Sequence, residues 1–297
     1  MTPESFDFLS AFVKEHSGLI LNKGKEYLLE HRLLPLARNH GVDNIDALVE
    51  MMRRPGSGQL GEAVVDAMTT NESFFFRDKT PFDQFESTML PAMLENRSSQ
   101  RKFRIWCAAA STGQEPYSLA MCLKEAAEKL LHWRIEILGT DLSAEVLEKA
   151  KAGMYSQFEV QRGLPIKLLV KYFKQIGELW QVDAALKAMV TYKPLNLMKD
   201  FSALGKFDIV FCRNVLIYFD QPTKKLVLER IARQLAPDGF LVLGAAETVI
   251  GITDVFRPVP GHRGLYAPRA GAAGDAAPAR SAVPGATTAP AGFMRTG

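Results

Sequence analysis

The sequence lacks the marks of several protein classes. No apolar run reaches the ~18 residues that a membrane-spanning helix needs, and residues 1–10 have neither the basic start nor the apolar stretch of a signal peptide. The three cysteines, Cys107, Cys122 and Cys212, form no Cys-x-x-Cys pair, so we expect them to pack in the core of a protein from a reducing, cytoplasmic compartment. The five histidines have no ligand spacing, and we therefore expect no metal site.

The chain also lacks a large excess of charge of either sign. Lys and Arg total 36 against 33 Asp and Glu, which gives a formal net charge of +3. That balance does not by itself indicate a nucleic-acid partner, so any basic function has to come from local clustering. Apolar residues are abundant, at 47% of 297 residues, which is enough to bury the core of one large domain and a smaller one.

The stretch 103–118 organises the rest of the chain. Residues 103–107 are apolar β-formers, residues 111–113 turn the chain, and residues 117–128 have helical apolar spacing. A strand, a tight turn and a helix form the first unit of a doubly wound nucleotide-binding sheet. The turn lacks GxGxxG, so a cofactor turn and ordinary strand–helix packing both remain open. Glu115 would favour a ligand with hydroxyls or positive charge over a pyrophosphate.

Further strands are predicted at 135–138, 207–212, 240–243 and 264–267. Asp141 follows the first of these, where an acid commonly accepts hydrogen bonds from ribose hydroxyls, and capping of the helix that begins at Ala144 is compatible with that role. From 165 to 189 the alternation of strands and helices breaks. We expect an inserted β-rich subdomain there, with a hairpin near Gly177.

Residues 1 to about 68 are predicted to form four helices. The second, from about 24 to 39, carries a basic arc of Lys25, His31, Arg32 and Arg38 beside its apolar face. This arc is either a solvated helix face or a docking surface for an acidic helix or nucleic acid.

Polar residues precede three aromatics and Arg77 in the stretch 69–77. Aromatics beside a charge can wall off a reactive site and exclude water. They can also form a core cluster with Arg77 at its edge.

Six segments together resemble one family. They are TTNESFFFR at 69–77, IWCAAASTGQEPYS at 105–118, TDLS at 140–143, NL at 196–197, FDIVFCRNVLIYF at 207–219 and LAPDGFLVLGAAE at 235–247. The chain resembles the chemotaxis receptor glutamate methyltransferases of the CheR type over roughly residues 5–268. The last segment alone is a general signature of S-adenosylmethionine-dependent methyltransferases, whereas CRNVLIYF combined with STGQEPYS and NESFFFR is highly specific.

The resemblance implies an α/β fold with a small all-α domain and linker at 1–78 and a Rossmann-like methyltransferase domain at 79–268. It also implies an antiparallel β-subdomain inserted at about 163–193. The Ala/Gly/Pro-rich stretch 269–297 is predicted to be disordered from its composition.

The resemblance also implies site residues, with S-adenosylmethionine as cofactor and S-adenosylhomocysteine as product. The implied cofactor-binding residues are Asn71, Ser73, Arg77, Glu115, Asp141, Asn196, Leu197, Asn214 and Val215. The implied catalytic residues are Arg77 and Tyr218, and the implied receptor-docking residues are Lys25, Arg32 and Arg38. Ser73 stands where the family often has Thr, and Gln114 where it often has an acid.

The implied substrate is the cytoplasmic helical bundle of methyl-accepting chemoreceptors, whose glutamates become methyl esters in chemosensory adaptation. We therefore expect a cytoplasmic monomer, recruited to membrane receptor arrays, that neither inserts into the membrane nor binds nucleic acid. Family members that bind a receptor's C-terminal pentapeptide have extra glycines in the β-subdomain, whereas only Gly177 lies between Phe173 and Val190 here. This difference predicts a pentapeptide-independent enzyme.

Two other functions compete with this interpretation. A nucleic-acid methyltransferase fits the basic pI of about 8.7, but amino-methylating enzymes of that kind usually carry Asn-Pro-Pro-aromatic where this chain has Arg-Asn-Val-Leu at 213–216. A cofactor-binding module without catalysis is the second, and the intact NESFFFR stretch argues against it.

Overall fold

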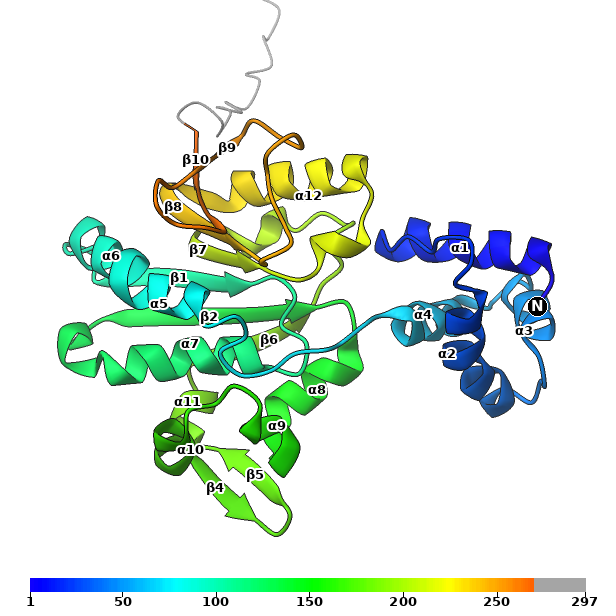
Figure 1. Cartoon of the computed structure of the whole chain (residues 1–297), viewed down its shortest axis with the longest axis horizontal. Coiled ribbons are helices and arrows are strands. Elements are labelled where there is room, and N and C mark those ends of the chain that lie inside the picture. Colours follow the sequence, from blue (N-terminus) through cyan, green and yellow to red (C-terminus); the bar gives the residue numbers. More distant parts are fainter. Residues whose placement is uncertain (270–297) are drawn as a thin grey trace, which may run out of the picture.

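The computed structural model describes residues 1–269, which form three parts (Figure 1). A small helical domain precedes a large α/β domain, and a small β-subdomain projects from the α/β domain. The stretch 269–297, predicted to be disordered, lies outside the described residues apart from Arg269. In residues 1–269, no helix combines the length and apolarity needed to cross a bilayer.

Four helices build the N-terminal domain, as predicted. They are α1 (Pro3–Ser17), α2 (Glu26–Asn39), α3 (Ile45–Met52) and α4 (Gly58–Met68). The side chain of Thr2 caps α1 by accepting a hydrogen bond from the Ser5 N–H, and Asn44 caps α3 in the same way. The apolar stripes of the four helices meet in a core of their own that includes Leu9, Leu33, Leu48 and Val64.

A seven-stranded sheet forms the centre of the large domain, in the order β6-β2-β1-β7-β8-β10-β9. Its strands are β1 (Lys102–Cys107), β2 (Arg134–Asp141), β6 (Val190–Pro194), β7 (Phe207–Cys212), β8 (Leu235–Leu243), β9 (Phe256–Pro258) and β10 (Leu265–Pro268). The first five strands in the sheet order pair in parallel, and β10 pairs antiparallel with both β8 and β9. The parallel strands therefore present their carboxyl ends at one edge, which faces the N-terminal domain (Figure 1).

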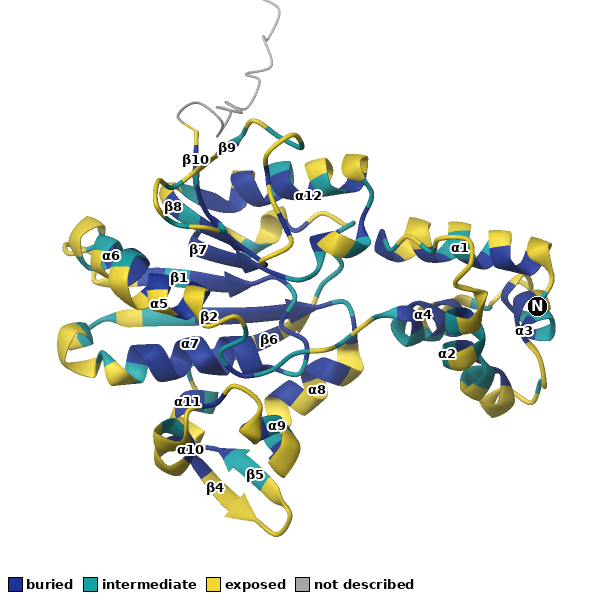
Figure 2. Ribbon diagram, viewed as in Figure 1, coloured by how far each residue is buried: buried dark blue, intermediate teal, exposed yellow. Residues whose placement is uncertain are grey.

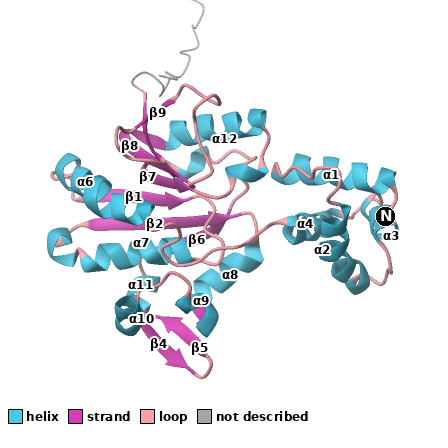
Figure 3. Cartoon of the chain, viewed as in Figure 1, coloured by secondary structure: helices cyan, strands magenta, loops and turns pink. Residues whose placement is uncertain are grey.

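Both faces of this sheet are covered, which explains why its strands are apolar runs (Figures 2 and 3). Ile105 and Cys107 of β1 pack with one helical layer, whereas Trp106 packs with the other. The first layer contains α5 (Thr80–Gln84), a π-helical turn (Phe85–Met89), α6 (Leu90–Asn96), α7 (Gln114–Glu125) and α8 (Ala144–Ala152). The second layer is α12 (Gln221–Gln234). The predicted Rossmann-like α/β class is confirmed.

The small subdomain is an antiparallel sheet in the order β3-β5-β4, flanked by three short helices. Its elements are β3 (Met154–Ser156), α9 (Gln157–Gln161), α10 (Ile166–Tyr172), β4 (Phe173–Ile176), β5 (Leu179–Val182) and α11 (Ala184–Lys187). The boundaries of this sheet differ at both ends from those predicted for the insert, about 163–193. It begins at Met154, and β6 pairs in parallel with β2 of the main sheet because Val190 and Tyr192 turn buried side chains toward the main core.

Candidate active site

A pocket opens at the carboxyl ends of β1, β2, β6 and β7. The turn after β1 contributes Ala108 and Ala109, and Leu142 follows β2. All the residues predicted to bind the cofactor or to catalyse lie on its wall: Asn71, Ser73, Arg77, Glu115, Asp141, Asn196, Leu197, Asn214, Val215 and Tyr218. The sheet thus brings together side chains that are widely separated along the chain.

The turn between β1 and α7 depends on Gly113. This residue has φ of +95°, in the left-handed region that favours glycine. A Cβ atom there would lie 2.8 Å from the hydroxyl oxygen of Tyr192 and 2.9 Å from Cβ of Ala150. Glycine therefore lets the turn approach both neighbours closely, which brings the start of α7 and Glu115 to the pocket.

Asp141 ends β2 and faces this turn. Its Oδ2 accepts a hydrogen bond from the Ser111 N–H at 2.8 Å, and its Oδ1 accepts one from the Ser143 N–H at 3.1 Å. Burial raises the pKa of Asp141, and these N–H donors oppose the shift. Ser143 provides the side-chain cap of α8, so the alternative that Asp141 caps this helix is wrong. The carboxylate keeps lone pairs that can accept from further hydroxyls.

Glu115 and Arg213 form a buried ion pair in the pocket wall. Nη1 of Arg213 lies 2.7 Å from Oε2 of Glu115, and its Nη2 lies 2.8 Å from Oδ2 of Asp78. Burial raises the pKa of Glu115, while the charge of Arg213 opposes the shift. Arg213 was not among the predicted site residues. Its position directly after the apolar strand β7 could have indicated it, because a charge buried at the end of such a strand needs a partner.

The linker 69–77 lines the pocket with polar side chains, but its three aromatics point elsewhere. Phe75 is fully buried and packs edge-on against Tyr155 and Phe173, and Phe76 packs against Phe82. None of Phe74, Phe75 and Phe76 lines the pocket. The core alternative therefore holds for Phe75 and Phe76, whereas Phe74 is half-buried and faces the guanidinium groups of Arg77 and Arg162. The aromatic side chains on the wall are Tyr218 and Phe219.

Comparison with known families explains this arrangement. Residues 4–69 match the family model described as the CheR methyltransferase all-alpha domain, and residues 71–265 match the CheR methyltransferase SAM binding domain. The chain belongs to the CheR methyltransferase family. The resemblance noted from the six sequence segments is thereby confirmed, and S-adenosylmethionine is the cofactor.

Curated relatives agree with the family over most of the chain. Chemotaxis protein methyltransferase Cher2 of Pseudomonas putida is 39% identical over 264 residues, which cover 88% of this chain and 96% of that protein. Chemotaxis protein methyltransferase 1 of Pseudomonas aeruginosa is 40% identical over 264 residues, with the same coverage of each chain. Chemotaxis protein methyltransferase of Escherichia coli is 33% identical over 246 residues, covering 82% of this chain and 83% of that protein.

The wall of the CheR pocket fits S-adenosylmethionine chemically. Asp141 and Glu115 suit ribose hydroxyls and positive charge, and Arg77 suits a carboxylate. Apolar side chains for a flat ring come from Leu142, Leu195 and Leu197. No cluster of three or more His, Cys, Asp or Glu side chains that could hold a metal ion occurs in residues 1–269.

The N-terminal domain of this CheR chain also contributes to the pocket, which the sequence did not predict. Ser17 and Leu19 lie on the wall. Nδ2 of Asn196 donates a hydrogen bond at 2.5 Å to the His16 carbonyl at the end of α1, and the Ile20 N–H donates to the Tyr218 carbonyl at 3.0 Å. The pocket is therefore formed by both domains.

Arg32 of α2 holds the linker between these domains. Its Nη1 donates to the carbonyls of Met68 at 2.6 Å and Thr69 at 2.9 Å, and its Nη2 donates to Oγ1 of Thr70 at 2.9 Å. Three donors of the Arg32 guanidinium therefore face the chain itself, and its predicted docking role stays a prediction. Lys25 and Arg38 are exposed.

Proposed function

We propose that this CheR methyltransferase transfers the methyl group of S-adenosylmethionine to glutamate side chains on the cytoplasmic helices of chemoreceptors, forming glutamyl methyl esters in chemosensory adaptation. The observation that carries the proposal is the meeting of Arg77, Tyr218 and two buried carboxylates on one pocket wall. The names of the curated relatives support the chemosensory role.

The sulfonium of the cofactor supplies an electrophilic methyl group. A glutamate carboxylate has an ordinary pKa of about 4.3, so it is ionised at neutral pH and needs no general base. The chain has to orient and desolvate that carboxylate, and positioning of this kind can supply much of the rate. We assign the orienting role to Arg77, whose Nη1 donates to the Glu72 carbonyl at 2.7 Å and whose guanidinium lies 5.4 Å from the Phe74 ring centre.

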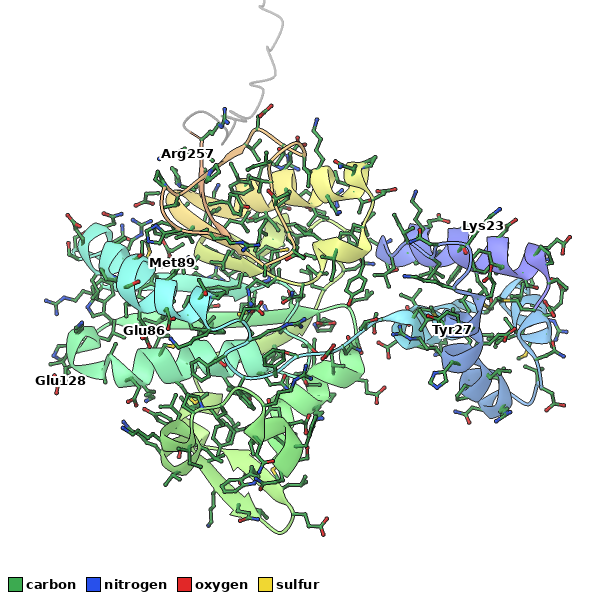
Figure 4. All side chains as sticks on the ribbon, in the orientation of Figure 1. Lys23, Tyr27, Glu86, Met89, Glu128 and Arg257 are labelled. Carbon is green, nitrogen blue, oxygen red and sulfur yellow. The ribbon has the colours of Figure 1, made fainter. Side chains whose placement is uncertain are left out.

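The docking surface follows from the exposed part of the basic arc. Lys25, His31 and Arg38 are exposed on or beside α2, and Lys23 and Tyr27 extend the surface toward its start (Figure 4). An acidic receptor helix would complement these charges, and Tyr27 offers an aromatic side chain that is 67% exposed. The proposal implies a monomer in the cytoplasm, at receptor arrays, with no nucleic-acid partner.

Pentapeptide independence belongs to the same proposal. The strands β4 and β5 are joined by a two-residue turn, Gly177 and Glu178, since Ile176 pairs with Leu179. Such a short connection leaves little loop to receive an added peptide. We expect calorimetry with a receptor C-terminal pentapeptide to give no heat of binding, and tight, saturable binding would contradict this part.

The test of the main proposal uses S-adenosylmethionine labelled in its methyl group. The full chain is incubated with receptor cytoplasmic fragments, with the same fragments carrying Glu→Gln at their methylation sites, and with nucleic acid. A base-labile label on the unmodified fragments alone supports the proposal. Label on nucleic acid, or no transfer at all, would overturn it in favour of one of the two competing functions.

A further inference from the structure

The loop that follows β7 carries much of the pocket wall. Residues 213–219 supply Arg213, Asn214, Val215, Tyr218 and Phe219 to it. The loop is not regular, because Asn214 has φ of +60° and a short 3₁₀ turn spans Leu216–Tyr218. Asparagine adopts the left-handed region more readily than most residues with a side chain, so this φ value alone does not fix the shape of the loop. Something outside the loop therefore has to determine its shape.

Glu247, from the turn after β8, makes the necessary contacts. Its Oε2 accepts hydrogen bonds from the N–H groups of Asn214 at 2.8 Å and Gly244 at 2.7 Å. Its Oε1 accepts from the N–H groups of Val215 at 3.0 Å and Leu216 at 2.7 Å. The side chain is buried and is absent from the pocket wall. One carboxylate thus satisfies four backbone donors, three of them in the loop.

Gly244 makes room for this arrangement. A Cβ atom on Gly244 would lie 2.7 Å from Oε2 of Glu247 and 2.9 Å from Nδ2 of Asn214. The carboxylate and the loop could not both keep their positions beside a larger residue. The close approach of two segments, the turn that carries Gly244 and Glu247 and the loop that carries Asn214, therefore depends on glycine at position 244.

We propose that Glu247 is a positioning residue of the active site, which sets the loop 213–219 and through it the placement of Asn214, Val215 and Tyr218. Hydrogen bonds to a charged acceptor are stronger than those between neutral groups, and burial keeps water from competing for them. The carboxylate touches neither cofactor nor substrate in this account. It acts only through the backbone that carries the residues of the wall.

The isosteric change Glu247→Gln tests this. An amide has one oxygen, so two of the four N–H groups would face an NH₂ donor and lose their acceptor. We expect the dissociation constant for S-adenosylhomocysteine to rise about tenfold, as the loss of about one good hydrogen bond would produce. Methyl transfer should fall about 100-fold, because a misplacement near 1 Å can have that effect. Binding of S-adenosylhomocysteine needs no receptor, so this readout holds whatever the methyl acceptor is.

Asp208→Asn is the matched control. Asp208 lies at the opposite end of the same strand β7, is equally buried at 9% exposure, and accepts the Arg104 N–H at 2.8 Å. This variant should lower the melting temperature and leave the affinity for S-adenosylhomocysteine unchanged. Wild-type affinity and turnover in folded Glu247→Gln would overturn the inference, and so would an equal loss of affinity in Asp208→Asn.

If Glu247→Gln does not fold, the variant Gly244→Ala tests the same positioning role of Glu247. It retains the carboxylate and displaces it together with the loop, since the new Cβ would contact both. The expected result is again a weaker affinity for S-adenosylhomocysteine, by about tenfold. An unchanged affinity in this variant would contradict the proposal.

Discussion

Arg213 and Glu115 form an ion pair inside the wall of the cofactor pocket, with Nη1 of the arginine 2.7 Å from Oε2 of the carboxylate. The arginine side chain is 2% exposed and the glutamate side chain 10%. The pair joins the end of β7 to the first turn of α7, and a second contact to Asp78 extends it to the linker. A change at Arg213 or Glu115 should therefore affect both the shape of the pocket and the stability of the fold.

The first prediction concerns this pair. Arg213→Met should reduce the free energy of unfolding by about 3–5 kcal/mol, because it leaves the buried carboxylate of Glu115 without a compensating charge. Denaturant unfolding measures the change. Glu115→Gln, which keeps a hydrogen-bond acceptor for the arginine, should cost less. Equal free energies of unfolding in the two variants would contradict the claim that Arg213 compensates the buried charge of Glu115.

The second prediction concerns cofactor affinity. Asp141→Ala should raise the dissociation constant for S-adenosylhomocysteine by about tenfold to 100-fold, the range for losing a hydrogen bond to a charged acceptor. Isothermal titration calorimetry measures it. Asp183→Ala is a suitable control, since Asp183 also accepts a backbone N–H, from Ala185, but caps α11 in the β-subdomain. An unchanged constant in Asp141→Ala would remove this residue from the ribose site.

The third prediction concerns catalysis. Arg77→Ala should lower methyl transfer about 100-fold or more through the loss of orientation, while the chain folds normally because Arg77 is only half-buried. Initial rates with labelled cofactor and receptor fragments, together with a melting curve, measure both effects. Arg77→Lys should restore little, since an ammonium group cannot reproduce the planar fork of a guanidinium. Turnover at the wild-type level in Arg77→Ala would refute its assigned role.

Much of the fold was predictable because burial on both faces leaves an unambiguous pattern. The strand β7 was predicted at the residues where it occurs, 207–212, and every one of them is buried. The strand β6 was missed because only two of its five residues, Val190 and Tyr192, are buried, and so short an alternation that ends in Lys and Pro does not distinguish a sheet edge from a loop. The strand β3 has three residues, too few for any periodicity to show.

The site was predictable where a residue follows a strand of the parallel sheet, and unpredictable where a contact joins segments far apart in the sequence. Asp141 ends β2 and Glu115 lies in the first turn of the helix that follows β1, so their place at the pocket follows from parallel pairing. Arg32 instead donates to the carbonyls of Met68, at the end of α4, and Thr69, in the linker, and helical spacing on α2 cannot reveal a partner on another segment. Glu247 ends the segment 235–247, a general methyltransferase signature that does not reveal the role of a single residue. Its four backbone donors come from two loops that meet only in the folded chain.

The last prediction concerns the contact between α1 and α12. Oδ1 of Asp220 accepts the Thr223 N–H at 2.9 Å, and its Oδ2 lies 2.8 Å from Nζ of Lys14. Hydrogen bonds to Lys14 and Thr223 lower the pKa of Asp220 to about 2. The carboxyl group of Asp220 binds a proton less readily in the folded chain than in the unfolded chain. Asp220 therefore stabilises the fold above pH ~3.8, and its contribution is lost as the pH falls toward about 2.

The variant Asp220→Asn tests this contribution. It keeps an acceptor for the cap but not the charge, so it should lower the melting temperature at pH 7 by up to about 3 °C. The difference from wild type should vanish near pH 2. Lys14→Gln should produce a similar loss at pH 7 that does not add to the first, since both variants remove one interaction. A difference that persisted unchanged at pH 2, or two losses that added fully, would show that the ion pair does not join the domains.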